Sequence, residues 1–215
     1  MLRLLFVPAA IALALGVATG AVHAQEMPGI NSIYIQAYGG LRVPDNLLFD
    51  GTGYDLGIGT SLGASVGVDT SVPGLSAEVD YFKSSASYTA LGTTLDSQSL
   101  MVDGVYGLPI PLVGLKPYVG AGLGAVNVTY KSGASGTGLG YQLKAGVQGS
   151  ITDQLSWFGE YRYQQAFSPV GVGPDTAEYA SHSIVGGLKL SFGTGGFSGF
   201  GSGNGYGGGG TYSGY

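Results

Sequence analysis

KPYVGAGLGA, residues 116–125, alternates between two kinds of position along its whole length. One set of positions is apolar and comprises Pro117, Val119, Ala121, Leu123 and Ala125, whereas Tyr118, Gly120, Gly122 and Gly124 lie between them. A period of two is typical of a β-strand, whose successive side chains point to opposite faces. Glycine weakens a strand interior, so the almost bare second face indicates a close approach or a tight curve, as in a small barrel.

Two other interpretations of residues 116–125 lead to different classes of protein. An edge strand in a soluble sandwich would show the same period. The glycines also resemble the GxGxxG fingerprint of dinucleotide-binding folds, but the third glycine is misplaced and no helix is predicted after it. The spacing therefore excludes a nucleotide site.

The composition conflicts with a soluble domain. The chain is 44% hydrophobic and only 10% charged, whereas soluble domains average about 25% charged residues. Beyond the N-terminus, no apolar run approaches the length of a membrane helix. An apolar composition without a second helix-length apolar run is expected for a transmembrane β-barrel, whose spanning segments are short and alternating. The absence of cysteine excludes thiol catalysis and cysteine-based metal sites.

The N-terminus has the organisation of an export signal. Arg3 precedes an uncharged apolar run over residues 4–20, and a cleavage site of the Ala-x-Ala type, VHA at 22–24 preceded by Ala21, follows. This order predicts a signal peptide over residues 1–24 and a mature chain that starts near Gln25. An uncleaved membrane anchor is the alternative, although the run is short for a span.

Alternation recurs along the chain and predicts eight strands. They are expected at residues 32–42, 56–69, 75–82, 95–106, 116–130, 139–148, 155–164 and 181–192. With apolar side chains outward and polar ones inward, they predict an all-β fold, an eight-stranded antiparallel up-and-down transmembrane β-barrel. Compact turns are expected near residues 70, 110 and 152, and longer polar loops near 47, 88, 134 and 171, which matches short periplasmic turns and longer outer loops.

The inward positions carry ionic side chains of both signs. These are Arg42, Glu78, Asp80, Asp103, Lys144, Glu160, Arg162 and Lys189, four acids and four bases. Buried ions are costly unless matched, so we predict a paired network inside the barrel. The glycine face of residues 116–125 is expected to make room for Glu78, Lys144 and Arg162. An eight-stranded interior is just filled by side chains, so an open pore is not expected.

Aromatic residues at outward positions predict two girdles at the membrane surfaces. Tyr106, Trp157 and Phe192 are expected at the periplasmic rim, and Tyr81, Tyr141 and Tyr163 at the outer rim. The barrel domain is assigned to residues 25–192. Residues 193–215 contain 12 glycines and no charge, which predicts a flexible tail, with a plug or an envelope contact as the alternative.

Together these features resemble the eight-stranded outer-membrane β-barrel family that includes the outer-membrane protein A, X and W barrels and the opacity-type surface antigens. The resemblance covers residues 32–192, and its carriers are the signal peptide, KPYVGAGLGA, WFGEYRY at 157–163 and SHSIVGGLKLSF at 181–192. It implies a monomer in the cell outer membrane of a Gram-negative envelope, with no cofactor, metal or nucleic-acid partner. Outer-membrane lipid, lipopolysaccharide, the barrel-insertion machinery and periplasmic chaperones are the implied partners. The insertion signal of the family is a terminal aromatic residue, here Phe192 or, after the tail, Tyr215.

The expected function is a structural role in envelope integrity together with surface contact, without catalysis. A channel for small solutes or hydrophobic molecules is one alternative. A lipid A-modifying enzyme is another, because some eight-stranded barrels are deacylases or palmitoyltransferases. The resemblance to the deacylases would imply a His-x-Ser pair followed later in the chain by an acid. Here His182 directly adjoins Ser183, and no acid follows Glu178. The expected outer-loop acids could bind divalent cations or keep the loops solvated; they are Asp45, Asp50, Asp55, Asp175 and Glu178.

Overall fold

The computed structural model describes residues 29–44, 47–49, 52–54, 57–88, 93–110, 112–130, 135–168, 170–172, 175–177 and 179–192. The expected signal peptide and the glycine-rich tail lie outside the described residues, as do Asp45, Asp50, Asp55 and Glu178. Among the described residues, no helix is long and apolar enough to cross a membrane.

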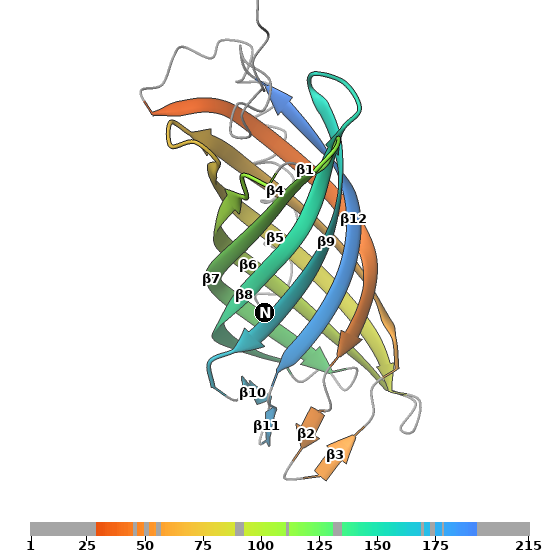
Figure 1. Cartoon of the computed structure of the whole chain (residues 1–215). Coiled ribbons are helices and arrows are strands. Elements are labelled where there is room, and N and C mark those ends of the chain that lie inside the picture. The colour runs from red at the N-terminus through yellow and green to blue at the C-terminus, as the bar shows by residue number, and fades with distance from the viewer. Residues whose placement is uncertain are drawn as a thin grey trace, which may run out of the picture.

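Eight long strands form a closed barrel (Figure 1). They are β1 (Ile30–Pro44), β4 (Gly59–Thr70), β5 (Leu75–Tyr88), β6 (Thr93–Gly107), β7 (Lys116–Tyr130), β8 (Ser135–Ser150), β9 (Leu155–Ala166) and β12 (Ala180–Phe192). Each pairs antiparallel with the next barrel strand along the chain, and β12 pairs with β1 to close the sheet. The predicted eight-stranded antiparallel barrel is confirmed.

The wall of the barrel is apolar outside and polar inside. Leu62, Leu139 and Ile184 expose 69%, 69% and 67% of their surface, whereas the inward polar side chains are buried. A soluble barrel would have the opposite polarity, and an apolar outer band is typical of a barrel that faces lipid. In each predicted strand, the apolar positions therefore face outward toward lipid and the polar positions face the barrel interior.

Aromatic rings and glycines face each other across neighbouring strands inside the wall. Tyr34 pairs with Gly67, Tyr38 with Gly63, and both rings lie over the bare backbone. A Cβ added at Gly63 would come within 2.3 Å of the Tyr38 hydroxyl. Glycine on β4 thus leaves the space that the tyrosine rings of β1 fill, a packing arrangement that also fixes strand register.

Several barrel strands are longer than predicted. β5 continues to Tyr88 and β6 begins at Thr93, so most of the polar segment expected as a loop at 84–93 is paired. β8 likewise begins at Ser135 instead of at residue 139. Only residues 89–92 and 131–134 connect these strands. The prediction of longer loops near 88 and 134 is therefore wrong, because backbone pairing continues where the apolar alternation stops.

Two connections that were expected as loops contribute a second, small sheet at one end of the barrel (Figure 1). Its strands are β2 (Leu47–Phe49), β3 (Thr52–Tyr54), β10 (Val170–Val172) and β11 (Asp175–Ala177), in the order β10-β11-β2-β3. The start of β1 and the end of β12 lie at the opposite end. Gly74 and Gly114 occur in connections at that opposite end, with φ of 79° and 71°, a conformation that favours glycine.

Candidate functional site

All eight ionic residues predicted to face inward are buried in the barrel interior. Their exposed fractions lie between 0% for Arg42 and Asp80 and 5% for Glu160. They come from six strands, β1, β5, β6, β8, β9 and β12. The structure brings six of them into one cluster and places Lys189 and Arg42 apart from it.

Arg162 on β9 is one centre of this cluster. Its Nη1 lies 2.5 Å from Asp80 Oδ2 and donates to the Tyr38 hydroxyl at 2.7 Å. Its Nε donates to Glu160, and its guanidinium lies 4.0 Å from the centroid of the Tyr38 ring. Tyr38 in turn donates to Asp80. One side chain therefore joins acids from β5 and β9 across the interior.

Lys144 on β8 is the second centre. Its Nζ pairs with Glu78 and lies 3.0 Å from Asp103 Oδ2 and 3.9 Å from Asp80 Oδ2. Gln142 Nε2 donates to both oxygens of Asp103 at 2.7 Å and to Asp80 Oδ2 at 3.1 Å. Asp80 thus connects the lysine and arginine centres. Paired, hydrogen-bonded charges of this kind can be held in a low-dielectric interior.

Three of these carboxylates meet the distance requirement of a cation site. One oxygen each of Glu78, Asp80 and Asp103 lie within 4.8 Å of one another. The ammonium group of Lys144 already lies beside all three. A metal ion would have to compete with this ammonium for the same oxygens.

Lys189 belongs to a separate pair with Asp69, an acid that the sequence analysis did not include. Lys189 Nζ lies 3.9 Å from Asp69 Oδ1 and 3.4 Å from the centroid of the Tyr34 ring. Asp69 accepts hydrogen bonds from Ser32 and, at 2.7 Å, from Ser76. The predicted balance of four acids and four bases is therefore wrong, because Asp69 is a fifth buried acid. Its inward position two residues after Gly67 is the signal that could have identified it.

The glycine face of β7 makes room for two members of the cluster. A Cβ at Gly122 would lie 1.7 Å from Asp103 Oδ1 and 2.8 Å from the backbone oxygen of Val102. A Cβ at Gly120 would lie 3.3 Å from Lys144 Cε. The predicted role in packing holds for Lys144, but the acid that uses the space at Gly122 is Asp103.

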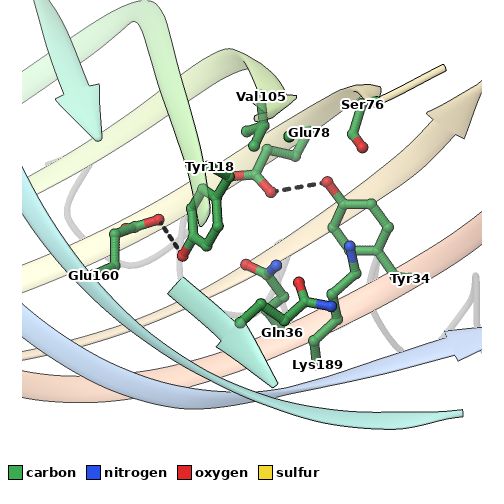
Figure 2. A pocket seen from close by; sticks show the side chains of 11 residues that line it. Tyr34, Gln36, Ser76, Glu78, Val105, Tyr118, Glu160 and Lys189 are labelled. Atoms are coloured by element: carbon green, nitrogen blue, oxygen red, sulfur yellow. Dashed lines mark hydrogen bonds between the residues drawn. The ribbon is translucent and has the colours of Figure 1, made fainter. Parts of the chain in front are cut away.

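A small cavity remains at the edge of the network (Figure 2). Its volume is about 20 Å³, and its lining includes Tyr34, Glu78, Tyr118, Glu160 and Lys189. Tyr34 donates to Glu78 at 3.0 Å and Tyr118 donates to Glu160 at 2.9 Å, the two bonds drawn in Figure 2. A water molecule needs about 10–15 Å³ of such space. The cavity is thus suited to water and too small for a metabolite.

The six residues predicted as girdles all point outward from the wall. Tyr106 and Phe192 lie at strand ends opposite the small sheet, and Trp157 lies near the start of β9. Tyr141 contacts Tyr163 at a centroid distance of 6.1 Å and Phe167 at 5.5 Å. The sixth residue, Tyr81, donates to Gln98 at 3.1 Å. Phe167 was not predicted because it follows the last residue of the alternating strand.

Ser181, His182 and Ser183 alternate across the barrel wall. Ser181 and Ser183 are buried inside, with exposed fractions of 1% and 2%. His182 points outward, where its Nδ1 shares a hydrogen bond with the Tyr161 hydroxyl and its ring lies 4.9 Å from that of Tyr163. The wall separates this histidine from its neighbouring serines, unlike a nucleophile and its general base.

Comparisons with known proteins agree with this geometry. The family model described as outer membrane protein beta-barrel domain matches residues 10–192. Neisserial surface protein A is 21% identical with a TM-score of 0.57, over 74% of this chain and 96% of that chain. The N-terminal barrel of Pseudomonas aeruginosa OprF is 22% identical with a TM-score of 0.43, over 76% and 99%. Ail of Yersinia pestis, solved with the heparin analogue sucrose octasulfate, is 14% identical with a TM-score of 0.48, over 77% and 100%.

No curated protein matches the sequence. The family match nevertheless spans most of the chain and all of the barrel strands. Neisserial surface protein A shares the fold, and the outward apolar face is that of a barrel in lipid. The chain belongs to the outer-membrane protein β-barrel family, as the sequence resemblance implied.

Proposed function

We propose that this protein is a closed barrel that contributes to the integrity of the outer membrane and conducts no solutes. The filled interior carries the proposal. Arg162 links β9 to β5 on the opposite side of the lumen, and Lys144 links β8 to β5 and β6. The cavity beside them has a volume of only about 20 Å³. Side chains that are paired across the lumen stabilise the barrel and close it at the same time.

Solute uptake into liposomes tests this proposal. We expect liposomes that contain the folded full chain to swell in sugars and amino acids at the rate of protein-free liposomes. A wide porin reconstituted at the same protein-to-lipid ratio serves as the positive control. Swelling that depends on solute size would contradict the proposal and favour the small-solute channel.

The assignments that accompany this function are part of the proposal. The protein is a monomer whose apolar wall contacts outer-membrane lipid and lipopolysaccharide. Cleavage after Ala24 releases the barrel domain, periplasmic chaperones deliver it, and the insertion machinery reads Phe192 at the end of β12. The protein has no catalytic role; the separation of His182 from Ser181 and Ser183 supports this assignment.

A second role in surface contact is supported by the small sheet. β2, β3, β10 and β11 stand beyond one end of the barrel (Figure 1). We place this end outside the cell, because the two longest connections between barrel strands, residues 45–58 and 167–179, lie here, whereas the connections at the other end are residues 71–74, 108–115 and 151–154, and the longer loops of such barrels are extracellular. Paired backbone then stands at this end, where polar loops were expected.

Replacing residues 47–54 and 170–177 with short glycine–serine linkers tests this second role. We expect the variant to insert and keep its barrel, because the small sheet adds no strand to the closed wall, while attachment of cells to host or abiotic surfaces decreases. The control replaces residues 110–113 at the opposite end. Unchanged attachment by a variant that reaches the cell surface would refute the contact role.

A further inference from the structure

Arg42 on β1 is a buried cation outside the ion-pair network. It exposes 0% of its surface, and its Nη1 donates to Ser97 Oγ at 3.3 Å. Its Nε and Nη2 have no hydrogen-bond partner. Within the described part of the chain, every buried carboxylate pairs with Lys144, Arg162 or Lys189. The positive charge of Arg42 therefore has no compensating acid among these residues, a costly arrangement for a buried guanidinium.

The surroundings of Arg42 are rich in hydroxyl groups. Ser61 Oγ on the adjacent strand β4 also has no hydrogen-bond partner. Its residue pairs with Gly40, two positions from Arg42 on the same inward face. Ser97 bonds to Ser84 at 2.7 Å and to the Tyr179 hydroxyl at 3.1 Å. Among the described residues, three of the four buried side-chain atoms without a partner are thus donors on this one section of the β1–β4 wall.

Tyr179 covers the guanidinium group. The centroid of its ring lies 5.2 Å from Arg42 Cζ, and its hydroxyl contacts Ser181 at 3.2 Å. Tyr179 also packs in an apolar cluster whose other members are Leu95, Met101, Val126, Val128, Ala166 and Val170. Arg42 thus contacts this cluster through Tyr179 and is itself fully buried. Because the Arg42 side chain is fully buried, a ligand that binds it must be small.

We propose that Arg42 and Ser61 form a buried binding site for a small monovalent anion such as chloride. Guanidinium and hydroxyl groups without partners are the donors that an anion requires. A single negative charge neutralises Arg42, whereas a doubly charged phosphate would leave a net buried charge and carry a larger desolvation penalty. The bound anion would hold Arg42 beneath Tyr179 and stabilise the small-sheet end of the barrel.

Thermal unfolding of the full chain in detergent micelles tests the site, with sodium chloride compared with sodium gluconate at equal ionic strength. Gluconate is too large for a fully buried site. We expect saturating chloride to raise the midpoint by about 2–4 °C, because the ligand binds only the folded state. Arg42→Met should abolish the shift, whereas Lys83→Met, which removes an exposed charge from the outside of β5, should keep it.

Bromide provides a readout that needs no variant. In crystals grown with bromide, we expect an anomalous peak within hydrogen-bond distance of Arg42 Nε or Nη2 and of Ser61 Oγ. If Arg42→Met does not fold, Ser61→Ala replaces it, and a smaller chloride shift is expected. The same midpoint in chloride and gluconate, or a shift that Arg42→Met retains, would overturn the proposal.

Discussion

Replacing Arg162 with methionine is expected to lower the free energy of unfolding by about 3–5 kcal/mol. Arg162 pairs with Asp80 and Glu160 in a fully buried setting. Its removal leaves both carboxylates short of a cation, and an unpaired buried charge is much less stable than a matched one. Methionine keeps most of the side-chain volume, so the effect reports charge more than packing.

Urea unfolding in lipid vesicles measures this loss. Trp157 is the single tryptophan and lies on the outer wall, so its fluorescence follows the release of the barrel from lipid. Lys83→Met is the matched control, since it removes a cation from the outside of the wall and should change stability by less than about 0.5 kcal/mol. If both variants unfold at the midpoint of the wild type, the network does not stabilise the barrel.

Replacing Gly122 with leucine should destabilise the barrel by about 3 kcal/mol or more. The first added carbon alone would lie 1.7 Å from Asp103 Oδ1 and 2.8 Å from the Val102 carbonyl oxygen. Asp103 could move away only by breaking its ion pair with Lys144 and its hydrogen bonds with Gln142. The Val102 backbone oxygen is fixed by the pairing of the sheet. Both overpacking and loss of charge pairing follow from the one substitution.

Gly104→Ala is the control for this prediction. Gly104 lies on the neighbouring strand next to Asp103, and a Cβ there would meet no atom within 4 Å. We expect this variant to fold and unfold as the wild type does, by electrophoretic mobility of unheated samples and by urea titration. Gly122→Leu with a wild-type midpoint would show that the bare face of β7 is not needed for interior packing.

The strand faces could be predicted because lipid and interior select opposite side chains at every second position. Leu123 and Gly122 show this sorting on β7, as do Tyr161 and Arg162 on β9. The same parity predicts the inward position of the eight ionic residues from the sequence alone. It also gives the inward position of Asp69, the last residue of the strand predicted at 56–69.

The pairing of those ions could not be predicted from parity alone. Arg162 and Asp80 are 82 residues apart and lie on strands that are not neighbours. Which side chains meet across the lumen depends on strand tilt and stagger, which are properties of the closed barrel. For this reason the sequence predicted a network but not its two centres or the separation of Arg42.

The ends of the strands nearest the small sheet were the other feature that alternation did not reveal. Barrel strands here contain 12 to 16 residues, whereas about 9–11 are enough to cross a membrane. Beyond the lipid the outward face no longer needs apolar side chains, so Lys83 and Ser85 are tolerated in paired backbone. The strands of the small sheet contain three residues each, too few to show a period.

The coupling free energy between Arg162 and Asp80 tests most directly whether paired charges hold the barrel together. A double-mutant cycle with Arg162→Met, Asp80→Asn and the combined variant isolates this term from urea unfolding in vesicles. Because the two groups are in contact at 2.5 Å, we expect the combined variant to be more stable than the sum of the single effects by about 2 kcal/mol. Single effects that add to within about 0.5 kcal/mol would contradict the account.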